Sequence, residues 1–303
     1  MNTLMTRAVT AATASAAALA LAGCGGTGET AAAGSGGDGL TVIAGFYPLE
    51  WAAQRVGGDR VDVSSLTPPG AEAHDLELAP QDVAAVSEAD LLVYLEGFQP
   101  ALDEAAQNEA ADTAWDAGAA ADLSLTAEDG TVDPHFWLDP VRMAAVGDRL
   151  AERLAELDPQ GADAYRENAA DLRADLEALD GEAQGALADC RVNALVTAHD
   201  AFGYLGARYG LEVIGITGLN PSEEPTPEGL AEVTQLVRER GITTVYTETL
   251  VDPAIAETVA AEAGVETAVL DPVEGLTDES AGDDYLEVMR ANVATLEEGQ
   301  SCS

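Results

Sequence analysis

Apolar and polar positions follow two alternating periods from about residue 40 to the end of the chain. Short apolar runs, typical of buried strands, alternate with stretches in which apolar residues recur at helical spacing. The predicted strands are LTVIAG (40–45), VDVSSL (61–66), ADLLVYL (89–95), VNALVT (192–197), LEVIGI (211–216), TTVYTE (243–248) and VETAVL (265–270). Because strands that alternate with helices form βα units, the pattern predicts an α/β fold with parallel sheets.

The predicted helices are short between the strands and long in the middle of the chain. The short helices are predicted at 49–56, 80–87, 98–109, 201–209, 227–239, 253–263 and about 283–298. Another helix begins at Pro140, and roughly 30 further helical residues follow Pro159, a span of about 45 Å if unbroken. We therefore expect two lobes, each with a parallel sheet flanked by helices. The expected division is an N-terminal α/β lobe at 40–157, one long connecting helix at 158–189 and a C-terminal α/β lobe at 190–303.

The first 39 residues have the composition of a targeting segment followed by a linker. Arg7 and the amino terminus precede a small apolar run at 8–22, which is too short to span a bilayer and leads into LAGC. This ending resembles the lipobox of bacterial lipoproteins, which implies a signal peptide at 1–23 and a lipidated Cys24. Residues 24–39 then read as a flexible tether. We expect an extracytoplasmic protein, lipid-anchored to the outer face of the cell membrane; the alternative is an ordinary signal peptide with an incidental cysteine.

The charge of the chain is strongly negative. Its 303 residues include 55 acidic residues and 13 basic residues, every one of the latter an arginine, for a formal net charge of −42. Because nucleic-acid binding needs basic patches that face phosphates, this charge argues against a nucleic-acid partner. The acidity serves either to keep the protein soluble or to raise the local concentration of cations.

Two cysteines remain once Cys24 is assigned to the anchor. Cys190 and Cys302 form an even pair in an exported chain, and we predict that they form a disulfide. The bond closes a loop of about 112 residues, which corresponds to roughly 4–5 kcal/mol in the chain-entropy model. The alternative is two free thiols.

All three histidines of the chain lie at predicted strand ends or in loops. His199 follows the strand at 192–197, His74 lies in the loop TPPGAEAHDLELAP, and His135 lies in DPHFWLDP. Asp271 follows the strand at 265–270. Open parallel sheets bind ligands beyond the carboxyl ends of their strands, which is where these four residues are predicted to lie. Because imidazole and carboxylate groups suit zinc and related ions, the set predicts a metal site. The intervals of 61, 64 and 72 residues exclude a zinc-finger site and indicate two ligands from each lobe. Taken singly, each histidine is also compatible with a surface group.

Four segments resemble motifs of the solute-binding proteins of bacterial zinc and manganese ABC importers. They are PPGAEAHDLELAP, DPHFWLDP, HDAFGYLGARYGL and LDPVEGL, and GLNPSEEPTPEGLAEV resembles the segment after the third motif. The motifs occur in the right order from about residue 40 to the C-terminus. The resemblance implies two α/β lobes joined by a long helix, one metal ion in the cleft between them, and delivery to an ABC permease and its ATPase. From their positions in these motifs, the resemblance implies that His74, His135 and His199 are metal ligands and that Asp271 is the fourth ligand.

Two departures from the family pattern concern the ligands and the loop before them. Many zinc-specific members carry a long His-rich loop before the second motif, where this chain has only SLTAEDGTVDPH. This puts a metal-gathering role of that loop in doubt. Some members place an acid directly before the first ligand histidine, where this chain has Ala73. Glu72 and Glu248 are therefore reserve candidates for the fourth position; the alternative for both is a solvated acid or a hydrogen-bond acceptor beside a ligand.

Three nitrogen ligands and one oxygen ligand favour zinc over manganese, which prefers more oxygen. Manganese remains the alternative ion, in either case as the transported ligand. Two alternative functions are a zinc hydrolase and a surface adhesin. A hydrolase keeps one metal position open for water, which Asp271 would close, and the sequence has no H-E-x-x-H pattern. We therefore expect a non-enzymatic, monomeric metal-binding protein, with only small rearrangements on binding because the connecting helix resists hinge motion.

Overall fold

The computed structural model describes residues 39–127 and 129–303, which lie in one compact unit. The predicted signal peptide, the lipidated Cys24 and nearly all of the tether fall outside the described residues. Two parallel four-stranded sheets, each flanked by helices, give the α/β class that the sequence predicts. Within the described residues, no helix is both long enough and apolar enough to cross a membrane.

The first sheet has the strand order β2-β1-β3-β4, and all its strands run parallel. Its elements are β1 (Leu40–Ala44), α1 (Tyr47–Gly57), β2 (Val61–Ser65), α2 (Pro80–Glu88), β3 (Leu91–Tyr94), α3 (Pro100–Glu109), β4 (Ala114–Asp116) and α4 (Gly118–Ala121). Successive side chains of β1 alternate between the two faces, so that Val42 and Ala44 pack with α1 and α5 while Ile43 packs with α2 and α3. The sequence pattern did not predict β4 or α4.

The second sheet repeats this arrangement with the strand order β6-β5-β7-β8. Its elements are β5 (Ala194–Thr197), α7 (Gly203–Tyr209), β6 (Glu212–Gly215), α8 (Pro227–Arg240), β7 (Thr244–Thr247), α9 (Ala254–Ala263), β8 (Glu266–Val269) and α10 (Tyr285–Gly299). Helices α8 and α9 pack together on one side of this sheet, where Val196, Val237 and Val259 form a small core of their own. In both sheets the first strand lies between its two successors, which opens a crevice at the carboxyl ends.

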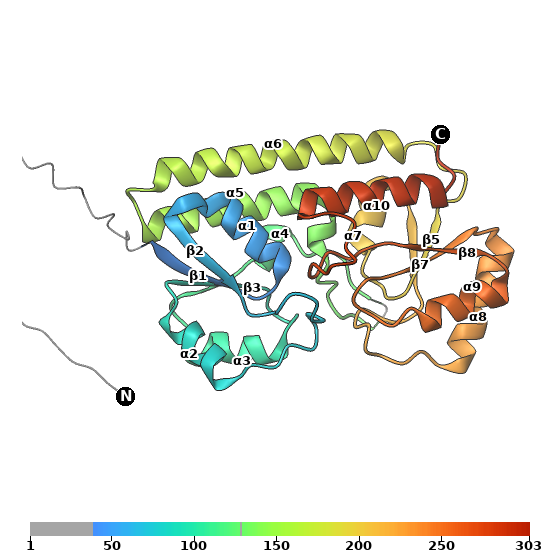
Figure 1. The fold of residues 1–303 in the computed structure, drawn as a ribbon, viewed down its shortest axis with the longest axis horizontal. Helices are drawn as coiled ribbons and strands as arrows, with labels where there is room; N and C mark the ends of the chain where they lie inside the picture. Colours follow the sequence, from blue (N-terminus) through green and yellow to red (C-terminus); the bar gives the residue numbers. More distant parts are fainter. Residues whose placement is uncertain (1–38, 128) are drawn as a thin grey trace, which may run out of the picture. The chain divides into compact units, whose positions relative to one another are not determined.

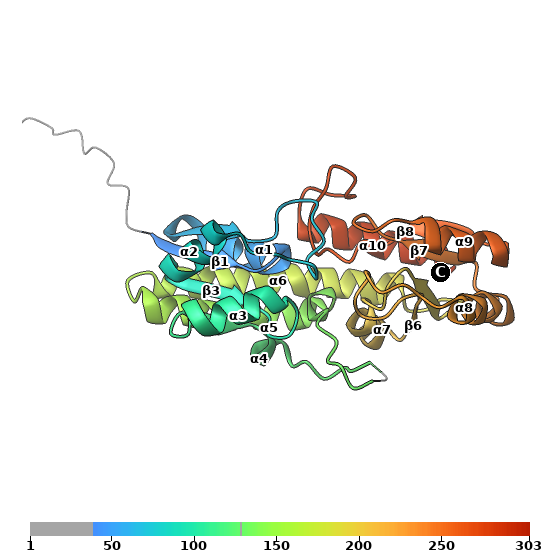
Figure 2. The same cartoon turned by 90° about the horizontal axis from the view of Figure 1, so that it is seen from below.

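Two long helices join the sheets. Helix α5 (Pro140–Leu157) packs along α6 (Ala162–Ala186), and α6 also contacts α1 along its first half and α10 along its second half (Figures 1 and 2). At 25 residues α6 is shorter than the expected stretch of 158–189. One continuous core includes Val42 of β1, Leu172 of α6 and Leu195 of β5. The two sheets therefore share a core, while the expected lobe boundaries at 157/158 and 189/190 stay a prediction.

Cys190 and Cys302 are joined by a disulfide, as the sequence predicts, and they are 112 residues apart in the chain. The bond connects the segment that enters β5 with the end of the chain after α10. The side chain of Gln300 supports the same junction, since its Nε2 donates to the carbonyl oxygens of Val192 and Ala194 at 2.9 Å each.

Reduction of this disulfide is expected to destabilise the protein without removing metal binding. The lost loop constraint is worth roughly 4–5 kcal/mol, which lowers the melting temperature of a chain this size by about 10 °C. Zinc affinity stays unchanged because neither cysteine is an expected ligand. Calorimetric melting and zinc titration with and without reductant measure both effects, and a Cys190→Ser/Cys302→Ser variant controls for side reactions of the reductant. Two titratable thiols in the native protein would contradict the prediction.

Candidate metal centre

Four side chains converge on one point at the carboxyl ends of the two sheets. They belong to His74, His135, His199 and Glu274, whose ligand atoms all lie within 4.8 Å of one another. The Nε2 atom of His135 lies 3.3 Å from Nε2 of His74 and 3.4 Å from Nε2 of His199. The Oε1 atom of Glu274 lies 3.6 Å from Nε2 of His74 and 3.5 Å from Nε2 of each of the other two histidines.

These separations match those of a tetrahedral zinc site. Zinc–nitrogen and zinc–oxygen distances of about 2.0–2.1 Å correspond to ligand–ligand distances of about 3.3–3.4 Å at the edges of a tetrahedron. The carboxylate oxygen Oε1 of Glu274 is buried and has no hydrogen-bond partner among the described residues. An unpartnered buried acceptor that faces three imidazoles is costly unless a cation satisfies it, so the donor set fits a divalent metal ion.

The strand order explains why residues far apart in sequence meet here. His74 lies in the loop after β2, His199 two residues after β5, and Glu274 in the loop after β8. His135 lies directly before a short 3₁₀ helix, Phe136–Leu138, in the segment that leads from the first sheet into α5. Three of the four residues therefore follow parallel strands at the expected ligand-binding edge, and His135 meets them there from the segment before α5.

Aromatic rings form one wall of the centre. The ring of Phe98 meets the edge of His74 with 4.5 Å between ring centroids, and Trp137 lies 5.2 Å from His135 by the same measure. His135 and His199 are at most 1% exposed and His74 is 9% exposed. Because this wall excludes water, charges within the centre interact more strongly than they would at the surface.

Two further carboxylates orient the imidazole rings. Oδ1 of Asp133 accepts from the backbone N–H of His135 at 2.9 Å and lies 2.8 Å from Nδ1 of its ring. Oε2 of Glu248 lies 2.7 Å from Nδ1 of His199. Each carboxylate favours the tautomer in which Nδ1 carries the proton and donates it, which leaves the lone pair of Nε2 directed at the centre.

The charges of the centre shift the titration of its members. Burial by itself lowers the pKa of His199, but the charge and hydrogen bond of Glu248, together with Glu274, outweigh burial and raise the pKa to about 10. Burial by itself raises the pKa of Glu274, but the three facing imidazoles outweigh it and hold the pKa well below its ordinary value. The metal-free centre therefore keeps Glu274 ionised and holds a proton on His199.

Asp271, which the sequence predicts as the fourth ligand, lies outside this group of four side chains. The structure brings the three histidines together with Glu274, whereas Asp271 is not among the converging residues. The carboxylate of Asp271 instead accepts from the backbone N–H of Val273 at 2.7 Å and from the hydroxyl groups of Thr249 and Ser280 at 3.1 and 3.3 Å. Asp271 and Glu274 belong to the same motif, as the first and second acids of LDPVEGL. The presence of two acids in that motif is the signal that could have indicated Glu274.

The reserve candidates Glu72 and Glu248 also lie outside the group of four. Oε1 of Glu72 accepts from the backbone N–H of His74 at 3.1 Å. Burial and the nearby charge of Glu274 raise the pKa of Glu72 to about 8. Both residues therefore accept hydrogen bonds from a histidine of the centre. This is the role that the sequence analysis gives as the alternative to metal ligation.

Replacement of Glu248 by glutamine is expected to weaken zinc binding by about tenfold, because partners that orient a ligand contribute about 10–100-fold to metal affinity. The glutamine oxygen still accepts from Nδ1 of His199, but the negative charge is lost. That charge favours a proton as well as zinc on His199, yet zinc carries twice the charge and loses more. Competition titration with a zinc chelator measures the change, and Glu266→Gln, an exposed acid on the neighbouring strand, is the matched control. An unchanged affinity in Glu248→Gln would contradict the role of this carboxylate.

Comparison with known proteins identifies the family. Residues 42–299 match the profile of the family described as zinc-uptake complex component A, periplasmic, or ZnuA. The chain belongs to the ZnuA family. The family match begins within β1 and includes every later strand and all four residues of the centre.

Individual relatives of this ZnuA-family chain agree with that match. It is 32% identical over 284 residues to the zinc-binding protein AdcA of Streptococcus pyogenes, which covers 85% of this chain and 55% of AdcA. It is 30% identical over 299 residues to the high-affinity zinc uptake system protein ZnuA of Bacillus subtilis, which covers 92% of this chain and 93% of that protein. The crystal structure of Zn(II)-bound AdcA from Streptococcus pneumoniae is similar with a TM-score of 0.76 at 32% identity, over 86% of this chain and 58% of that one. The chain thus spans about half the length of the AdcA proteins, and all three relatives are named for zinc binding or zinc uptake.

Proposed function

We propose that this protein is the extracytoplasmic solute-binding component of an ABC importer and that it captures Zn²⁺ as its transported ligand. The observation that carries the proposal is the convergence of three imidazole Nε2 atoms and one buried carboxylate oxygen at 3.3–3.6 Å. We assign the ligands as His74, His135, His199 and Glu274. The names of the relatives, which refer to zinc binding and zinc uptake, support the choice of ion.

The remaining parts of the proposal follow from the role of the protein in transport. A lipid on Cys24 keeps the protein at the outer face of the membrane, where a monomer passes its ion to the permease, and the cognate ATPase drives import. Manganese is the alternative cargo, since three histidines with a carboxylate that binds through both oxygens also suit that ion. The proposal includes no catalytic role, because a hydrolase leaves one metal position to water and we assign the fourth position to Glu274.

Metal analysis of protein purified without added metal tests the proposal most directly. We expect about one zinc ion per chain, retained against manganese in competition titrations. A strain that lacks this protein should take up less zinc and should recover with the parent chain but not with a triple variant that lacks His74, His135 and His199. Turnover of ester or peptide substrates that is lost on chelation would instead favour a zinc hydrolase.

Zinc binding is expected to release protons near neutral pH. Because the raised pKa of His199, about 10, means that its imidazole is protonated below that pH, zinc has to displace a proton from Nε2. Zinc affinity therefore rises from neutral pH toward about 10 and falls on acidification. Calorimetric titrations in buffers of different ionisation enthalpy count the released protons, and Glu248→Gln should release fewer because it lowers the pKa of His199. A binding enthalpy that does not depend on the buffer would contradict the prediction.

A further inference from the structure

The residue before Glu274 has an unusual backbone conformation. Val273 has a φ of +59° and is fully buried. A β-branched residue rarely adopts this left-handed region, because its Cβ substituents crowd the backbone, and such residues persist only where their surroundings impose the conformation. The conformation sets the path of the backbone directly before Glu274, so the direction of the glutamate side chain depends on it.

Side chains from two other parts of the chain hold the turn that contains Val273. The backbone N–H of Asp271 donates to Oδ1 of Asn292 at 2.9 Å, and Nδ2 of Asn292 donates to the carbonyl oxygen of Asp271 at 2.7 Å. The indole Nε1 of Trp137 donates to the carbonyl oxygen of Pro272 at 2.7 Å. The entry to the turn is thus fixed by α10 on one side and by the segment that carries His135 on the other.

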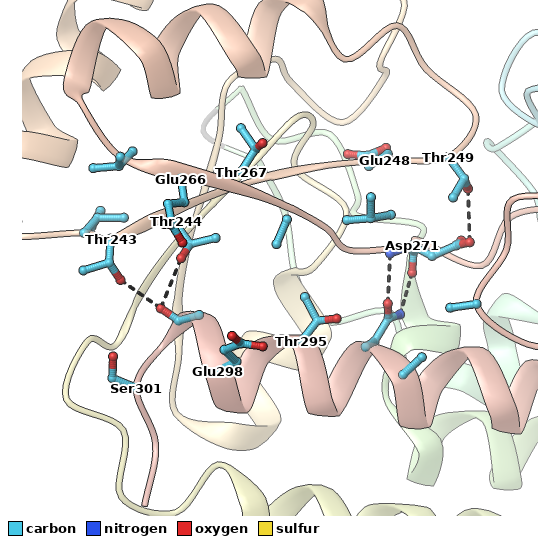
Figure 3. A pocket seen from close by; sticks show the side chains of 18 of the residues that line it. Thr243, Thr244, Glu248, Thr249, Glu266, Thr267, Asp271, Thr295, Glu298 and Ser301 are labelled. Atoms are coloured by element: carbon cyan, nitrogen blue, oxygen red, sulfur yellow. Dashed lines mark hydrogen bonds between the residues drawn. The ribbon is translucent and has the colours of Figure 1, made fainter.

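The carboxylate of Asp271 completes the turn from within. Its Oδ1 accepts from the backbone N–H of Val273, two residues further on, at 2.7 Å, which is the hydrogen bond of an Asx turn. Its Oδ2 accepts from Thr249 on the wall of the cavity between β8 and α10 (Figure 3). Oε1 of Glu274 has no hydrogen bond of its own among the described residues, so the backbone of the turn determines where this oxygen lies.

We propose that Asp271 is a positioning residue of the metal centre, which holds Val273 in the left-handed conformation and thereby directs Glu274 toward the three histidines. The inference rests on the proposed function, because it requires Glu274 to be a ligand. Asp271 then contributes to zinc affinity through a hydrogen bond to the backbone, not through its charge on the ion.

Five variants test this role by zinc competition titration of folded protein. Asp271→Ala removes the acceptor of the turn, and zinc affinity should fall by about tenfold or more, the range seen for partners that orient ligands. Asp271→Asn keeps an oxygen that accepts from Val273 and should bind zinc within about threefold of the parent. Glycine adopts positive φ without strain, so Val273→Gly should bind like the parent, and Asp271→Ala/Val273→Gly should recover most of the lost affinity. Glu274→Gln reports on the ligand itself.

The outcomes distinguish a positioning role from direct ligation and from a general loss of stability. A loss in Asp271→Asn equal to that in Asp271→Ala would overturn the positioning role in favour of charge or direct ligation. Failure of Val273→Gly to rescue Asp271→Ala would also overturn the positioning role. The loss of affinity in Asp271→Ala would then come from a general loss of stability, which removal of a buried valine side chain does not repair. If Glu274→Gln weakens zinc binding while Asp271→Ala does not, only the positioning role is wrong. If Glu274→Gln binds zinc like the parent, the proposed ligand set is wrong instead.

Discussion

Replacement of His135 by alanine is expected to lower zinc affinity by at least about 100-fold, more than loss of a partner that only orients a ligand. His135 is fully buried and its Nε2 lies within 3.5 Å of ligand atoms from His74, His199 and Glu274. No neighbouring side chain among the described residues is placed to take over this position: Asp133 contacts the far side of the ring. Competition titration with chelators of graded affinity measures the loss.

The control for this variant separates ligand loss from the loss of buried volume. Leu150→Ala truncates a fully buried side chain on α5, and it should lower the melting temperature while the folded protein keeps the zinc affinity of the parent. His135→Ala should instead lose zinc affinity, while the circular dichroism of the metal-free protein stays close to that of the parent. If His135→Ala bound zinc as tightly as the parent, His135 would have to be removed from the ligand set.

The alternation of strands and helices could be predicted from the sequence because most elements have a strong local pattern of apolar residues. Strand β5 is an apolar run whose four residues are all buried, and α5 carries apolar residues at helical spacing. Strand β4 was missed because it is three residues long, Ala-Trp-Asp, and all three are only partly buried. Its place in the sheet comes from pairing with β3, a tertiary contact that a single-sequence pattern does not encode.

The site was predictable as far as topology determines it. His74 and His199 lie in loops after parallel strands, and parallel sheets bring such loops to one edge, so the convergence of these two residues follows from the element order. His135 joins them from the segment that leads into α5. The fourth residue depends on the path of the backbone after β8. Asp271 comes earliest after the strand, but the left-handed Val273 turns the chain so that Glu274 faces the histidines. Because valine disfavours that conformation, local propensity gave no indication of the turn.

Replacement of Glu274 by glutamine is expected to weaken zinc binding by about 10–100-fold and manganese binding by a larger factor. Three neutral imidazoles leave a divalent ion with its full charge, and the single carboxylate of Glu274 compensates half of it. Glu274 is 1% exposed, so the attraction is only weakly screened by water. Glutamine keeps the shape and one oxygen but removes the charge, and the harder manganese ion depends more on anionic oxygen than zinc does.

Parallel competition titrations with both ions measure the two factors in the same preparation. Glu279→Gln is the matched control, because Glu279 is an exposed acid five residues further along the same loop and its replacement changes the net charge equally. The control should bind both ions like the parent, since an exposed charge is screened by water and salt. Equal weakening for zinc and manganese would mean that both ions depend equally on the charge of Glu274, and it would contradict the larger factor expected for manganese. Unchanged affinities would move the fourth position to Glu72 or to water, because Glu72 also lies beside His74 and has a buried carboxylate oxygen, Oε2, without a hydrogen-bond partner among the described residues.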